Sequence, residues 1–183
     1  MEYNNTKGEI KMSKKQSVIS FFIVVALGVL GHFLFDLTKS NLIALFTPVN
    51  ESIFEHLKLV FFPFIFIGIF RYFFNSKHQF LPSLLLSSLI GIITIPVLFY
   101  FYTFFLKSNA IINIIIFVIA CAAQEFMFYN LMNVNEENVI GKIESLITLF
   151  VITLVFITFT FYPPKLEIFQ DPTNHTYGIN EEK

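Results

Sequence analysis

Five long apolar segments constrain the fold of this chain more than any other feature of its sequence. Each is close to the roughly 20 residues that a helix needs to cross the hydrocarbon core of a bilayer. At that depth backbone polar groups must bond within their own segment, so such segments fold as helices. The sequence therefore predicts an all-α, polytopic membrane helix bundle with about five transmembrane helices. The segments are Val18 to Leu37, Leu57 to Phe74, Leu81 to Leu106, Ala110 to Met132 and Ser145 to Tyr162.

The composition supports this class and excludes others. Apolar residues make up 55% of the chain and charged residues only 14%, whereas a soluble domain carries about 25% charged residues. A formal net charge of −1 is at odds with nucleic-acid binding, which calls for a basic face. We therefore expect a multi-pass protein of the cell membrane, surrounded by the lipid bilayer and without a nucleic-acid partner. The composition identifies neither a protein partner nor a lipid or small-molecule substrate.

The positions of Lys and Arg predict the orientation, because cytoplasmic loops carry an excess of them. An N-in/C-out arrangement puts seven of these residues inside and five outside. The inner set is Lys7, Lys11, Lys14, Lys15, Arg71, Lys77 and Lys142, and the outer set is Lys39, Lys58, Lys107, Lys165 and Lys183.

This orientation divides the chain into three parts. Residues 1–17 form a cytoplasmic N-terminal tail, residues 18–162 a single transmembrane domain, and residues 163–183 an extracytoplasmic tail. Because the number of spans is odd, this tail emerges on the same face as the loop between the first two spans. We expect the tail to fold back on that loop.

Prolines mark where the middle helices begin and bend. Thr47 followed by Pro48 has the pattern of an N-cap and a first helical position, so the second helix is predicted to begin at Pro48. Pro63 and Pro96 lie inside apolar segments and are expected to kink their helices without ending them.

Five ionisable residues crowd the junction between the first two spans, and we take all five as candidate catalytic residues. Ionisable side chains at membrane depth are costly and usually have a partner or a task. The tail can add Asp171 and His175 to this group by folding back. The five residues are His32, Asp36, Glu51, Glu55 and His56.

Three interpretations of this cluster remain open. In the first, His32, Asp36, Glu55 and His56 bind a divalent metal such as zinc, which activates water for a hydrolase or transferase. In the second, a Glu and a His form a proton-transfer pair. In the third the cluster is structural: Glu55, for example, is spaced for an i, i+3 ion pair with Lys58. No His-Glu-x-x-His motif is present to decide among them.

A second polar position, Glu125, lies deep in the fourth segment. Pairing with Arg71 or Lys142 is the simplest explanation, and a proton-relay carboxylate is the alternative. Two functions other than an enzyme therefore remain open. The protein is a small transporter or permease-like protein with a proton relay, or it is a non-enzymatic accessory or scaffold protein.

One stretch resembles a known family. Residues 48–52, Pro-Val-Asn-Glu-Ser, are followed by the aromatic Phe54, then Glu55-His56, then Leu-Lys-Leu at residues 57–59. This pattern is similar to that of a family of small five-span bacterial membrane proteins of unknown function, in which the aromatic is usually Trp. The similarity continues into the tail, and it implies a topology but no activity. The tail residues that carry it are Pro163, Pro164, Asp171, Pro172, Tyr177 and Gly178.

Overall fold

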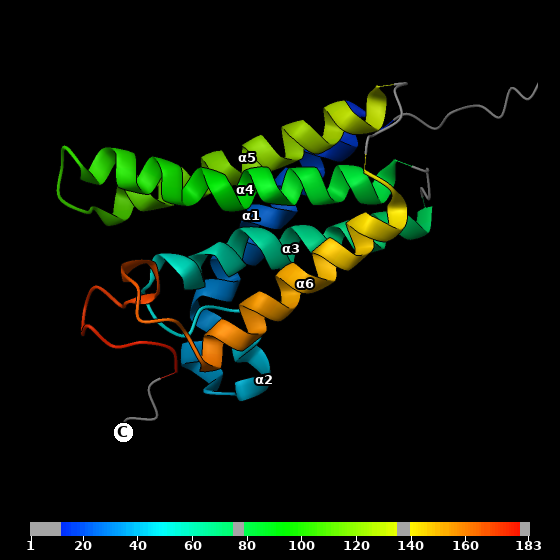
Figure 1. Cartoon of the computed structure of the whole chain (residues 1–183). Coiled ribbons are helices and arrows are strands. Elements are labelled where there is room, and N and C mark those ends of the chain that lie inside the picture. The colour runs from blue at the N-terminus through cyan, green and yellow to red at the C-terminus, as the bar shows by residue number, and fades with distance from the viewer. Residues whose placement is uncertain (1–11, 75–78, 135–139, 180–183) are drawn as a thin grey trace, which may run out of the picture.

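The computed structural model describes residues 12–74, 79–134 and 140–179, and it confirms the predicted fold class. Five helices are long and apolar enough to cross a membrane. A short helix, α2 (Asn41–Ala44), and a 3-10 turn, η1 (Glu167–Phe169), accompany them, and the described residues contain no β-strand. Figure 1 shows the long helices as one bundle. They are α1 (Lys14–Thr38), α3 (Ile53–Phe74), α4 (Phe80–Thr103), α5 (Ala110–Asn133) and α6 (Lys142–Phe161).

The orientation stays a prediction, and part of it lies outside the described residues. Lys7, Lys11, Lys77 and Lys183 are not described, nor is most of the predicted N-terminal tail. Lys58 cannot count as a loop charge, because it lies inside α3 with a fully buried side chain.

The helices begin and end for local reasons. Ser13 and Gln16 form a reciprocal capping box at the start of α1, and the side chain of Asn109 caps α5. Each cap satisfies backbone N–H groups that a helix start leaves without partners. Pro63 and Pro96 lie inside α3 and α4, which continue through them as expected.

The predicted start of the second helix at Pro48 is wrong, because α3 begins at Ile53. The hydroxyl of Thr47 does not cap a helix ahead of it. It donates to the carbonyl of Ile43, one turn back, and so closes α2. Residues 48–52 are left as a non-helical segment whose polar groups need other partners.

The helix α3 is the centre of the bundle. Every residue from Leu57 to Phe64 is buried, whereas the other long helices leave many large apolar side chains exposed, which is normal for helices that face lipid. Water does not reach a stretch that is buried on all sides, and a buried polar group without a hydrogen-bond partner is costly. Polar groups in this part of α3 therefore need partners inside the protein.

Gly28 lets α1 pack closely against α3. A methyl group at this position would lie 2.8 Å from the carbonyl oxygen of Leu59 and 2.5 Å from Cζ of Phe117. Small residues allow such backbone approach at helix contacts in membranes. Gly31 faces the same helix with more room, because its nearest neighbour, Cδ2 of Leu59, would lie 3.4 Å away.

Substituting Gly28 tests this packing. We expect Gly28→Ala to lower the free energy of unfolding by about 1–3 kcal/mol, the usual cost of overpacking. Gly31→Ala is the matched control and should change it little. Thermal unfolding of both variants in the same detergent is the measurement, and equal melting temperatures would contradict the close contact.

Candidate metal centre

Three side chains from three places in the chain converge at one end of the bundle. His32 lies near the end of α1, His56 lies in the first turn of α3, and Glu51 lies in the non-helical segment before it. The Nε2 atoms of the two histidines are 3.2 Å apart. Oε2 of Glu51 lies 3.5 Å from Nε2 of His56 and 3.9 Å from Nε2 of His32. These are three atoms of the kinds that bind transition metals.

The spacing of these atoms fits a metal ion. A circle through all three has a radius of about 2.1 Å, and zinc bonds to imidazole nitrogen and carboxylate oxygen are also about 2.0–2.2 Å. An ion can therefore lie at bonding distance from all three atoms without a change of rotamer. The geometry thus offers two nitrogen ligands and one oxygen ligand.

A hydrogen bond to the backbone orients the imidazole of His56. Nδ1 of His56 lies 2.8 Å from the carbonyl oxygen of Ser52 and donates to it, which leaves Nε2 without a proton and able to bind a metal. This arrangement is usual for metal-binding histidines. The imidazole of His32 has His56 as its hydrogen-bond partner, and its buried Nδ1 has none in the described part of the chain.

The C-terminal tail holds Glu51 in place. The backbone N–H of Glu51 donates to Oδ2 of Asp171, at 3.1 Å. Burial would raise the pKa of Asp171, but hydrogen bonds outweigh it and hold this pKa below its ordinary value. The donors are the side chain and backbone of Thr173 and the backbone N–H groups of Glu51 and Asn174. Nearby, the side-chain amide of Asn50 donates to the carbonyl of Gly178.

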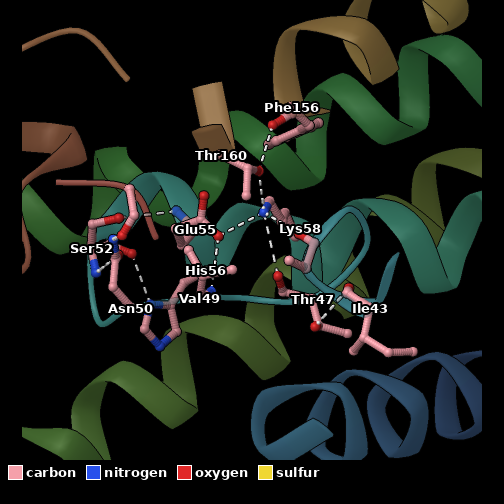
Figure 2. Close-up of polar contacts among 12 residues, drawn as sticks. Ile43, Thr47, Val49, Asn50, Ser52, Glu55, His56, Lys58, Phe156 and Thr160 are labelled. Carbon is pink, nitrogen blue, oxygen red and sulfur yellow. Dashed lines mark hydrogen bonds and ion pairs between the residues drawn. The ribbon is translucent and has the colours of Figure 1, made fainter. Parts of the chain in front are cut away.

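Beneath this centre lies a buried ion pair, drawn in Figure 2. Nζ of Lys58 lies 2.6 Å from Oε2 of Glu55, and both side chains are buried. Lys58 also donates to the carbonyls of Ala44 and Thr47 and to the hydroxyl of Thr160 on α6. The sequence interpretation of Glu55 and Lys58 as an ion pair is therefore confirmed.

This network fixes the backbone that carries the centre. Oε2 of Glu55 accepts a hydrogen bond from the N–H of Val49 as well as from Lys58. Through its four acceptors Lys58 joins the end of α2, the following segment, α3 and α6. The segment that bears Glu51 is thus attached at one end to the ion pair and at the other to Asp171.

The structure separates the remaining candidates from the centre. Asp36 is exposed and pairs with Lys39, at 2.7 Å, so it does not face His32. Glu55 is engaged with Lys58, as described above. His175 is exposed in the tail, with a left-handed backbone. Of the four side chains proposed from sequence as metal ligands, only His32 and His56 meet, and Glu51 occupies the position we had assigned to the other carboxylates.

A pocket of about 430 Å³ opens beside His56 and Glu51. Residues of α3, α4 and α5 form its apolar floor, and its polar rim is formed by the tail, by Asn113 in the first turn of α5 and by Ser108 in the α4–α5 turn. Figure 1 shows the tail and this turn at the same end of the bundle. Of the rim residues, the sequence placed only His175 beside the cluster, through the predicted fold-back of the tail. The other rim residues lie more than fifty positions from His56 and follow no motif. They are Ser108, Asn113, Glu167, Gln170 and Thr173.

Glu125 belongs to a different site. Its carboxylate binds Arg71, with Nη2 and Oε1 2.6 Å apart, which is the structural pairing considered from the sequence. A separate groove beside it is lined by residues of α1 and α5 and shares no lining residue with the pocket at His56.

Five apolar helices around a polar centre near their ends define this chain as a multi-pass membrane protein. The sequence model of DUF6512, a family of unknown function, matches residues 1–179. The chain therefore belongs to this family, which confirms the resemblance to a family of unknown function seen in its sequence. No curated protein and no solved structure matches the chain.

The buried ion pair predicts a large loss of stability when one partner is removed. We expect Lys58→Met to lower the free energy of unfolding by about 3–5 kcal/mol, because the carboxylate of Glu55 is left buried without its cation. The double variant Glu55→Gln, Lys58→Met should recover part of this loss.

Lys39→Met is the matched control for this experiment. It removes the lysine of an i, i+3 pair that is exposed, which is worth about 0–1 kcal/mol. Thermal unfolding of the three variants measures the difference. A Lys58→Met protein as stable as Lys39→Met would show that the network does not support the fold.

The hydrogen bonds of Asp171 predict that its substitution loosens the C-terminal tail locally. Asp171→Asn should speed hydrogen–deuterium exchange of residues 166–179 at pH 7, since the amide offers fewer acceptor positions to Thr173 and Glu51. The lowered pKa of Asp171 sets the sign of the pH dependence: this stabilisation is present above the ordinary pKa and is lost as the pH falls through the lowered one. Unchanged exchange in the variant would contradict the role of Asp171.

Proposed function

We propose that this protein is a metal-dependent hydrolase of the cell membrane, with His32, His56 and Glu51 as zinc ligands. The observation that carries the proposal is the convergence of one oxygen and two nitrogen atoms on a point about 2.1 Å from each. A divalent metal was one of the interpretations left open by the sequence, although with Asp36 and Glu55 in place of Glu51.

The number of ligands supports catalysis over a purely structural role. Structural zinc sites are closed by four protein ligands, whereas catalytic sites use three and keep one position for water or substrate. Here the three ligand residues are all partly exposed, with side-chain exposures of 28–48%. The pocket of about 430 Å³ begins at two of them, so water and substrate have a route to the open position.

The chemistry follows from this arrangement. Zinc lowers the pKa of bound water to near 7, which supplies a hydroxide nucleophile at neutral pH, and it polarises a carbonyl or phosphoryl oxygen. The protein contributes the fixed positions of the ligands, which the α1–α3 contact, the Lys58 network and the tail provide. With the predicted orientation, the reaction takes place on the extracytoplasmic face.

Two observations favour an enzyme over the transport alternative. A proton relay would need Glu125 to communicate with the polar cluster, but this carboxylate is paired with Arg71. Its groove also shares no lining residue with the pocket at the candidate centre. Convergence of His32, His56 and Glu51 likewise favours an enzyme over a scaffold, which has no need of side chains directed at one another.

Zinc content tests the proposal. We expect about one zinc ion per chain in protein purified without chelator, and a Zn²⁺ affinity lower in His32→Ala and His56→Ala by more than the 10- to 100-fold typical of lost outer-shell partners. Asp36→Asn is the matched control, since it removes a nearby exposed carboxylate and should leave affinity unchanged. Elemental analysis and chelator competition measure both quantities. Equal zinc affinity in His56→Ala and Asp36→Asn would reject this centre.

A further inference from the structure

The lining of the pocket beside the candidate centre is polar at the rim and apolar at the floor. Its rim is polar, with Ser108, Asn113 and Thr173 among its residues, and its floor is formed by apolar side chains such as Leu59, Ile95 and Ile116. About 12 Å of helix separates Ile95 from the end of α4 at Thr103. The floor therefore lies well inside the apolar layer and the rim lies at its edge.

We propose that this pocket binds a single-chain amphiphile with an uncharged head group, its acyl chain on the floor and its head at the rim. This inference names the substrate class of the proposed hydrolase and rests on that function. A floor at membrane depth suits a hydrocarbon chain, since pockets are largely apolar with a few polar groups that fix orientation. Its volume of about 430 Å³ is in the lower half of the usual range of 300–1,000 Å³, which suits one chain better than two.

The charged residues at the rim favour a ligand with an uncharged head group. Glu51 and Glu167 line the pocket, and no Lys or Arg is among the described residues that do so. Phosphate recognition normally uses Arg, Lys or a helix N-terminus, so a phosphorylated head group lacks its usual partners here. The rim instead carries hydroxyl and amide groups, from Ser108, Asn113 and Gln170. Asn113 bonds to Tyr102 and Ser108, and Gln170 bonds to the carbonyl of His175, but each group keeps a further donor or acceptor position for the hydroxyl groups of a glycerol ester.

The pocket brings the junction between chain and head close to the ligands. His56 and Glu51 both line the pocket, and His56 lies one turn before the floor residue Leu59 on α3. The ester of a monoacylglycerol would be placed beside them. His32, His56 and Glu51 would hold the metal, which would activate a water molecule. In the proposed hydrolysis the oxygen of water bonds to the ester carbonyl carbon, and the bond from that carbon to the glycerol oxygen breaks. One proton of the water goes to the glycerol oxygen, and the other is released from the carboxylic acid.

The test uses the full chain in nanodiscs of ether-linked phospholipids, which contain no ester. The substrates are monodecanoin, whose chain suits the depth of the pocket, and monobutyrin, whose chain is too short to reach the floor.

Ile116→Phe narrows the floor, and the matched control Ile115→Phe enlarges a neighbouring residue that is 51% exposed. We expect Ile116→Phe to lower the ratio of decanoate to butyrate release about tenfold, a usual effect of misfit in an apolar pocket, and Ile115→Phe to leave it unchanged. Equal ratios in the two variants would overturn the inference.

A second measurement separates this inference from the proposed hydrolase. A diazirine derivative of monodecanoin is cross-linked to His32→Ala, which lacks a metal ligand but keeps the pocket lining intact. Labelling of the α4 and α5 floor residues without ester hydrolysis by the wild-type protein would retain the amphiphile site and reject the hydrolase. Hydrolysis without such labelling would retain the hydrolase and reject the site. Stronger labelling by a decanoyl lysophosphatidate probe would overturn the assignment of an uncharged head.

Discussion

The buried ammonium group of Lys58 is the interaction on which the rest of this structure depends. A charge without contact with water is very costly unless several polar groups surround it. Lys58 finds these groups in Glu55, in two carbonyls around α2 and in the hydroxyl of Thr160. These partners come from four parts of the chain, so one side chain fixes the positions of these segments relative to one another. Hydrophobic contacts alone would not fix them. Lipid chains are as apolar as the core, so burial does not drive helices together inside a bilayer.

The ligand atoms of the candidate centre also depend on fixed positions of the helices that carry them. Its two histidines lie on different helices. Their Nε2 atoms, 3.2 Å apart, must stay within about 4 Å of each other, twice a zinc–nitrogen bond length, to share an ion. Gly28, one turn before His32, sets the distance between α1 and α3, and the buried ion pair sets the path of the chain into α3. A displacement of 1 Å in either element would open the ligand triangle. The structural network and the functional cluster, considered from the sequence as alternatives, are adjacent parts of one arrangement.

The sequence predicted much of the fold because the bilayer imposes strong and simple rules. Length and hydropathy located all five long helices. The start of α3 was missed because Thr47 bonds backward to Ile43, a choice that local pattern does not reveal. The ligand set was only partly predicted. Helical spacing groups His32 with Asp36, but Lys39 lies equally near to Asp36 and pairs with it, and Glu51 reaches the histidines through a non-helical segment that has no periodicity.

The bilayer also explains why the polar groups lie at the end of the bundle. The same ligand set at the midplane would require the removal of water from charged groups on every side. Near the helix ends the tail supplies hydrogen bonds to Asn50 and Glu51, while the floor of the pocket stays in the apolar layer. A site in this position can take an apolar chain from the membrane and water from outside it. Few places on a bundle of this size satisfy both conditions, and here His56 belongs to the candidate centre and also lines the pocket.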